Sequence, residues 1–269
     1  MEVIMFNGFD HAILGVNDLP RAEADLRGLG FTVTTRPDVG ATDTENRLIC
    51  FPDGSYIEIF AFRDPAHPGS HRWAPVLAKG DGWLDYSLHV ADVNAEAQRL
   101  NQAGVATVGP RTGGRALADG RRWGVAVLLA GRGVGSPVLP FLIQDTEARA
   151  TRVPGGDAAR QPGGVAGILG IRVLTSALAS VEPGLDVVFG AGTAVAHPGA
   201  TTARRYVCAG RWVEVIQPAN DGTEMAAHLQ RRGEGVYEVL LGRPDETGGA
   251  EGVLLPTAAM HGARLRLAA

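Results

Sequence analysis

The chain has 269 residues, of which 45% are hydrophobic and 20% are charged, and its formal net charge is −4. This composition is typical of a globular protein with one large or two ordinary domains, and it excludes fibrous and largely disordered chains. Lys and Arg are scattered along the chain and form no basic stripe, so we expect no nucleic-acid partner. No signal peptide and no run of the ~20 apolar residues of a membrane helix is found, which favours a cytoplasmic protein without a membrane partner.

The predicted elements begin with a strand over residues 9–16 and a helix that Asp18 caps. Three further runs have strand composition and are separated by turn residues, which predicts strands over 32–39, 46–52 and 56–62. The order of this first module is therefore strand, helix and three strands.

The same order recurs from about Gly80. Residues 83–90 are predicted as a strand and Asp92 as the cap of a second helix. The last two strands of this module are predicted over 123–131 and 137–144. Such repetition indicates an architecture built from copies of one module.

Two segments connect the copies. Residues 71–80 are predicted as a connecting helix that packs between the copies, with a cavity position for His71 as the alternative. Residues 149–164 are rich in Pro, Gly and charge and have little to bury, so they are predicted as a linker. Beyond the linker the pattern returns in degenerate and truncated form. We therefore predict one module pair over 1–148 and a second, degenerate pair over 165–269.

The two cysteines, Cys50 and Cys208, lie in apolar runs of strand composition. Reduced thiols in the core are expected there, in preference to a disulfide or a nucleophile. Neither cysteine is therefore a candidate for the chemistry of the protein.

Four stretches carry a family resemblance, "FDHAILGVNDL", "YIEIFAFRDP", "HRWAPVLAKGDG" and "WVEVIQP". In them the sequence resembles the vicinal oxygen chelate superfamily, in its glyoxalase, bleomycin resistance and extradiol dioxygenase type. The resemblance is strong over residues 1–150 and weak after 165. It implies an α+β fold of repeated βαβββ modules, paired into open, cup-like mixed sheets that often hold a divalent metal on the inner face.

A buried carboxylate is expected on the strand over 56–62. Alternation puts Glu58 on one face with Tyr56 and Phe60, and a carboxylate between aromatic rings needs a cation. The resemblance implies that His11 and Glu58 bind this metal together. Imidazole and carboxylate suit zinc, iron, manganese or nickel (Zn, Fe, Mn or Ni). The alternative is that His11 only hydrogen-bonds Glu58 in a polar core.

The second module is expected to complete the site. Asp85 precedes the capping Asp92 by as many residues as His11 precedes Asp18, which makes Asp85 the family-equivalent third metal ligand. His89 lies on the same face but ~13 Å further along the strand. We expect His89 to act as a catalytic acid or base, and it is a metal ligand only if the register differs.

The fourth ligand position falls on Phe141, which has no carboxylate. In glyoxalases that carboxylate also moves the substrate proton, so its absence weighs against glyoxalase I chemistry. Three protein ligands would leave positions open for water or substrate, as in a facial triad. In the second half the same count puts Leu169 at the histidine position and Arg266 at the last carboxylate, beside Glu214 and Glu238. We expect a mainly structural second half, with a separate ligand pocket as the alternative.

Aromatic and basic residues are candidates for substrate binding. Arg121 and Arg122 stand at the rim of the predicted cup, where they are able to hold a carboxylate or phosphate, although a solvated arginine pair fits as well. Trp123 follows them and is able to stack on such a substrate. The full set of candidates is Tyr56, Phe60, Arg121, Arg122, Trp123 and Phe141.

Two functions follow as hypotheses. The first is a divalent-metal-dependent enzyme of lyase, isomerase or dioxygenase type that acts on a small oxygenated molecule. The second is a metal-free small-molecule binding protein of the drug-sequestering, resistance type. Three ionisable groups on inward faces favour the enzyme. One module pair is able to complete a site within a single chain, so a homodimer is compatible with the sequence without being required.

Overall fold

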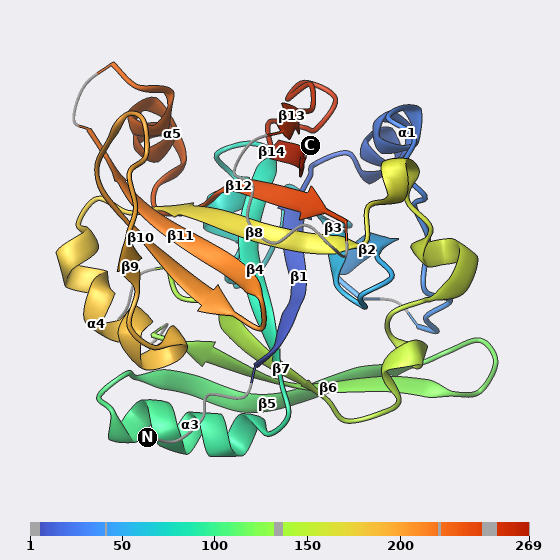
Figure 1. Cartoon of the computed structure of the whole chain (residues 1–269). Coiled ribbons are helices and arrows are strands. Elements are labelled where there is room, and N and C mark those ends of the chain that lie inside the picture. Colours follow the sequence, from blue (N-terminus) through green and yellow to red (C-terminus); the bar gives the residue numbers. More distant parts are fainter. Residues whose placement is uncertain (1–5, 41, 132–136, 220–221, 244–251, 269) are drawn as a thin grey trace.

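The computed structural model describes residues 6–40, 42–131, 137–219, 222–243 and 252–268. It has two mixed sheets of seven strands with few helices, which confirms the expected α+β fold of paired modules (Figure 1). The first sheet contains β1 (Phe6–Gly15), β2 (Thr44–Cys50), β3 (Tyr56–Phe62), β4 (Gly82–Val90), β5 (Thr107–Ala116), β6 (Arg122–Ala130) and β7 (Phe141–Asp145). The second contains β8 (Gly167–Leu174), β9 (Thr193–Ala194), β10 (Ala200–Cys208), β11 (Arg211–Pro218), β12 (Gly235–Gly242), β13 (Gly252–Leu254) and β14 (Arg264–Ala268). The helices are α1 (Leu19–Gly28), α2 (Ala74–Leu77), α3 (Val93–Gln102), α4 (Leu178–Phe189) and α5 (Glu224–Arg232).

Both sheets have the same symmetric strand order. It is β2-β3-β1-β4-β7-β6-β5 in the first sheet and β13-β14-β12-β8-β11-β10-β9 in the second. The first strands of two modules pair antiparallel at the centre, and each is flanked by the last strand of its own module, which runs parallel to it. Each sheet is therefore a pair of related modules.

One hydrophobic cluster unites the two sheets. It contains the aliphatic faces of β1 and β8, with Leu14 and Ile171 among them, and the buried stripes of α1 and α3. The opposite faces of the same strands carry His11 and Arg172. Because the aliphatic faces share one core, the polar faces of the two sheets form separate environments.

Two predicted elements differ from the structure. Residues 32–39 form only the isolated bridges Thr34–Leu48 and Asp38–Leu117 in place of a strand, since Pro37 has no N–H to donate to a ladder. The connecting helix is restricted to Ala74–Leu77. Residues 71–73, which precede this helix, are therefore not helical.

The segment 149–164 joins the two sheets and also packs on the first one. It forms three 3₁₀ turns, η1 (Arg149–Thr151), η2 (Gly156–Ala159) and η3 (Pro162–Gly164). The expectation that it has little to bury is wrong, because Arg152 is only 2% exposed and Gln161 donates to the Cys50 carbonyl. The exact domain boundaries stay a prediction.

Both cysteines are buried free thiols, as expected. Burial raises the pKa of each thiol to about 12. None of the helices in the described ranges is both long and apolar enough to span a membrane.

Candidate functional site

The register of the first sheet brings the predicted ligand positions onto one face. Ile13 on β1 pairs with Glu58 on β3 and with Asp85 on β4. Two residues earlier, His11 lies on the same face as Ile13. The count from the capping aspartates thus places these side chains around the centre of one polar face.

His11 and Glu58 form a pair with oriented side chains. His11 Nε2 lies 3.4 Å from Glu58 Oε2. His11 Nδ1 lies 2.6 Å from Asp10 Oδ1 and 2.9 Å from Ser87 Oγ, and Asn46 Nδ2 donates to Glu58 Oε1 at 2.7 Å. A carboxylate on the second ring nitrogen is the arrangement that fixes metal-ligating histidines. The neighbours therefore turn Nε2 and Oε2 toward one another.

The pair is poised to be charged. Burial alone would raise the pKa of Glu58, but the hydrogen bond and charge of His11 and the charge of Arg36 lower it to about 2. Burial likewise opposes protonation of His11, and the carboxylates of Asp10 and Glu58 outweigh it, so the pKa of His11 is raised. The site thus attracts a cation to Nε2 and Oε2, either a proton or a metal.

Asp85 points to different partners. Its Oδ2 accepts from Trp73 Nε1 at 3.1 Å and lies 3.3 Å from Arg72 Nη1, while its Oδ1 accepts from the Tyr86 N–H. Among the residues that the structure describes, Asp85 does not come within 4.8 Å of both His11 and Glu58 through its carboxylate. The third ligand is on the predicted face but is not assembled with the pair.

Arg72 covers the fourth position. Its guanidinium carbon lies 4.5 Å above the Phe141 ring and 4.6 Å above the Trp73 ring. Phe141 in turn contacts His11 edge-on, with ring centroids 5.4 Å apart. No role for Arg72 was predicted from the sequence. The feature that could have indicated this contact is a cationic residue next to an aromatic one in "HRW".

An aromatic group forms the wall beside Glu58. His71 stacks on Phe60 at 5.2 Å, and Trp73 meets Phe60 at 4.9 Å. Burial and the charge of Arg72 lower the pKa of His71, so its imidazole is neutral at pH 7. On the other side of the pair, Tyr56 stacks on His11 at 4.5 Å.

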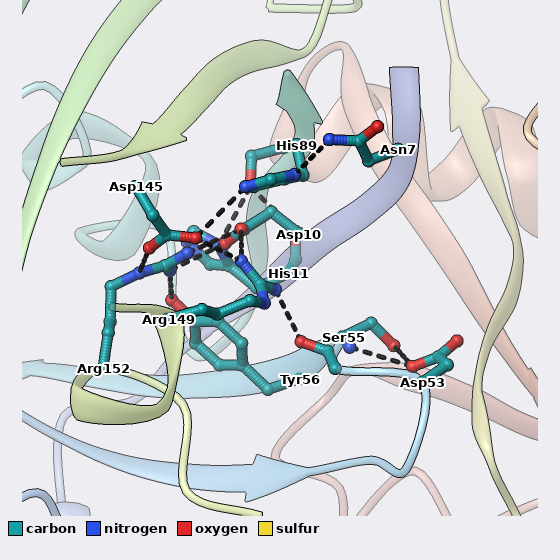
Figure 2. Close-up of polar contacts among 12 residues, drawn as sticks. Asn7, Asp10, His11, Asp53, Ser55, Tyr56, His89, Asp145, Arg149 and Arg152 are labelled. Atoms are coloured by element: carbon teal, nitrogen blue, oxygen red, sulfur yellow. Dashed lines mark hydrogen bonds and ion pairs between the residues drawn. The ribbon is translucent and has the colours of Figure 1, made fainter. Parts of the chain in front are cut away.

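His89 belongs to a second polar cluster (Figure 2). Its Nε2 lies 3.1 Å from Asp145 Oδ2, and its Nδ1 lies 2.9 Å from Asn7 Nδ2. Arg149 bridges Asp10 and Asp145, at 2.7 and 2.8 Å. Both ring nitrogens of His89 are thus engaged, and the cluster reaches His11 through Asp10.

The same cluster holds three potential metal ligands, Asp10, His89 and Asp145, whose ligand atoms lie within 4.8 Å of one another. Arg152 donates to both carboxylates, to Asp10 at 2.7 and 2.9 Å and to Asp145 at 2.7 Å. Burial opposes ionisation of Asp145, but His89 and the arginines hold its pKa well below the usual range. Two guanidiniums already neutralise these carboxylates, so an ion-pair network accounts for the cluster.

The rim residues are not brought to the pair. Arg121 pairs with Asp119 in the exposed turn between β5 and β6, and Arg122 is also exposed. Trp123 donates to Asp38 at 2.8 Å. The Trp123 ring lies under Arg36, 4.5 Å from its guanidinium carbon.

A cavity of about 410 Å³ lies between the two halves of the chain. Arg72, Trp73 and Leu84 line it from the first half, and His228 and Val236 from the second. Arg72 and Trp73 also contact Asp85, so the cavity adjoins the polar face of the first sheet. Its size falls within the range of small-molecule pockets.

Comparisons with known proteins agree with this architecture. A structure of a hypothetical protein from Staphylococcus aureus superposes with a TM-score of 0.70 at 17% identity, over 96% of this chain and 98% of that one. A 4-hydroxymandelate synthase variant from Streptomyces coelicolor matches with a TM-score of 0.58 at 16% identity, over 90% and 72% of the two chains. A xylose isomerase-like TIM barrel/4-hydroxyphenylpyruvate dioxygenase fusion protein matches with a TM-score of 0.56 at 15% identity, over 91% and 37%. At these identities the likeness shows the fold alone.

No curated protein matches the sequence significantly. The family model described as "Glyoxalase-like domain" matches residues 9–189, which include the first sheet from Phe9 onward and the beginning of the second. The expected glyoxalase-like resemblance is confirmed: the chain belongs to the glyoxalase-like domain family.

Proposed function

We propose that the protein is a divalent-metal-dependent enzyme of lyase, isomerase or dioxygenase type that acts on a small oxygenated molecule. The observation that carries the proposal is the His11–Glu58 pair, whose Nε2 and Oε2 atoms face each other at 3.4 Å. Two ligand atoms of a tetrahedral ion, each about 2.1 Å from the metal, are about 3.4 Å apart. The pair therefore fits one ion of the expected kind.

His11 and Glu58 would hold the metal, and Asp85 is our proposed third ligand. Asp10 on the His11 ring supplies the outer carboxylate that such a site needs. When bound, the ion would act as a Lewis acid on a substrate oxygen. Arg72 binds Asp85 in this structure, so binding of a metal by Asp85 requires Arg72 to release it.

The proposed substrate site is formed by side chains around the cavity and the polar face of the first sheet. We infer that the substrate enters through the cavity between the halves, with its apolar part against Phe60, Trp73 and Phe141. Arg72 would hold an anionic substrate oxygen, since it lines that cavity and its guanidinium lies over the Phe141 ring. His71 is the better placed group for proton transfer, because it is neutral at pH 7 and stacks on Phe60, whereas both ring nitrogens of His89 are engaged.

Metal content tests the proposal. The untagged protein is purified without chelator and analysed by elemental mass spectrometry, together with His11→Gln, Glu58→Gln and Asp85→Asn. We expect about one equivalent of a transition metal in the parent, loss in the first two variants and weaker retention in Asp85→Asn. His67→Gln is the matched control, because His67 pairs with Asp64 on the surface. Absence of metal from the parent after reconstitution with zinc, iron, manganese and nickel would contradict the proposal.

A metal-free binding protein is the second candidate. The observation in its favour is Arg72, whose charge occupies the space between Asp85 and Phe141. In that case a hydrophobic anion should bind in the presence of chelator, with an affinity that Arg72→Gln reduces and His11→Gln does not. Calorimetry with and without chelator therefore separates the two candidates.

A further inference from the structure

The second sheet repeats the central arrangement of the first with one decisive change. Arg172 on β8 pairs with Glu214 on β11 and with Glu238 on β12, as Ile13 pairs with Glu58 and Asp85. Arg172 Nε donates to Glu214 Oε2 at 3.0 Å, and Arg172 Nη1 donates to Glu238 Oε1. A guanidinium thus fills the space between the two acids.

The histidine position of this half falls on Gly170, which corrects the expected Leu169. Gly170 pairs with Trp212 as His11 pairs with Tyr56. A Cβ atom at residue 170 would lie 2.3–2.5 Å from the Trp212 ring, so only glycine fits beneath the indole. The second sheet cannot repeat the histidine–glutamate pair of the first.

Further arginines converge on the same two carboxylates. Arg205 donates to Glu214 at 2.6 Å, and Arg266 donates to both oxygens of Glu238, at 3.2 and 3.1 Å. Arg264 Nε lies 3.4 Å from Glu238 Oε2. Four guanidiniums therefore surround two buried carboxylates. A further acid, Glu224, accepts from Arg264 but is 66% exposed, which weakens its compensating effect.

A cavity of about 310 Å³ lies over this cluster. Three arginines and two glutamates line it together with Met225 and Tyr237, namely Arg172, Arg264, Arg266, Glu224 and Glu238. Within the described residues, the buried Nε of Arg264 finds no hydrogen-bond acceptor. A partly buried excess of cations is costly unless an acceptor with negative charge is present.

We infer that this cavity of the second sheet binds a small oxyanion, a carboxylate or phosphate group, through Arg264 and Arg266. The fork of a guanidinium matches the oxygens of both groups. Tyr237 and Met225 would contact an apolar remainder of the ligand. The site lies on the polar face opposite the shared core, so it is independent of His11 and Glu58 and of the proposed function.

Isothermal titration of the full chain with inorganic phosphate and with succinate tests the inference, at constant ionic strength set by chloride. We expect saturable binding of at least one probe at low-millimolar concentration, weakened about tenfold or more in Arg264→Gln. Arg121→Gln removes the same charge from an exposed turn and should leave binding unchanged. Glu224→Gln removes the competing rim carboxylate and should tighten binding. Which probe binds distinguishes phosphate from carboxylate.

Two outcomes would overturn the inference. One is the absence of saturable binding of either probe to the parent protein. The other is equal affinity of the parent, Arg264→Gln and Glu224→Gln, which would mean that the anion binds elsewhere. Circular dichroism of each variant keeps loss of binding distinct from loss of folding.

Discussion

The equivalent central strands β1 and β8 carry different side chains at one decisive position. Ile13 leaves Glu58 to face His11, whereas Arg172 at the corresponding position bonds to Glu214 and Glu238. An aliphatic residue neutralises no charge, so Glu58 keeps its carboxylate for the cation of the proposed metal site. The arginine neutralises its neighbours internally, so the second sheet is left with cations for an external anion.

His228 is a single residue that should make stability depend on pH. It is buried, packs edge-on against Tyr237, and its pKa is lowered from 6.5 to about 4 by burial and by Arg232, Arg231 and Arg264. Between these two values the unfolded chain binds the proton and the folded chain does not. The free energy of unfolding should therefore rise with pH across this interval, by roughly 3 kcal/mol at most.

Urea unfolding at a series of pH values measures this slope in the parent and in His228→Gln. The difference between the two curves isolates His228 from the other ionisable groups, and it should become independent of pH above pH 6.5, the usual pKa of the group. Parallel curves throughout the interval would mean that His228 titrates normally in the folded protein.

At the scale of elements, the segment 149–164 acts as a clamp on the first sheet. Arg152 is 2% exposed and donates to Asp10, Asp145 and the Tyr56 hydroxyl. Asp10 also orients His11. Through Asp10, the segment therefore contacts the candidate metal pair of His11 and Glu58.

Replacing Arg152 by Met should destabilise the protein by about 3–5 kcal/mol, because the buried Asp10 and the partly buried Asp145 lose a charged partner. Arg160→Met is the matched control in the same segment, since Arg160 is exposed and pairs only with Asp157 among the described residues. If the segment is only a spacer, both variants will have the same urea midpoint as the parent.

The sequence predicted the elements of the first sheet well where caps fix the offset between strand and helix. Asp18 and Asp92 both cap their helices, and counting from them placed His11 and Asp85 on one face. The corresponding helix α4 starts at Leu178, and its N-cap residue Ala177 has no capping side chain, so the same count missed Gly170.

The direction of side chains from irregular segments was not predictable. Arg72 and Arg152 come from stretches whose composition indicates only a helix start and a linker. Their positions depend on carboxylates that are distant in the sequence, Asp85 and Asp10. The local sequence pattern has no information on such contacts between distant residues. These contacts nevertheless decide whether the carboxylates of the predicted metal ligands are available to bind a metal.

At the scale of the whole molecule, the two sheets behave as one unit. The aliphatic faces of both belong to one buried cluster. Arg232 on α5 reaches across to the first half and donates to the carbonyls of Gly80, Asp81 and Trp83, at 2.7, 2.9 and 3.2 Å. Trp83 Nε1 returns a hydrogen bond to the Arg264 carbonyl at 2.9 Å.

We therefore expect a single cooperative unfolding transition, detected at the same urea concentration by tryptophan fluorescence and by far-ultraviolet circular dichroism. Arg232→Met removes three partly buried hydrogen bonds between the halves, so it should lower the free energy of unfolding by about 2–4 kcal/mol while the transition stays single. Arg231→Met, one residue earlier and more exposed, controls for the loss of charge. Two separated transitions in the parent would mean that each sheet folds independently and that the shared core contributes little. Separation only in Arg232→Met would instead identify this arginine as the source of the coupling between the sheets.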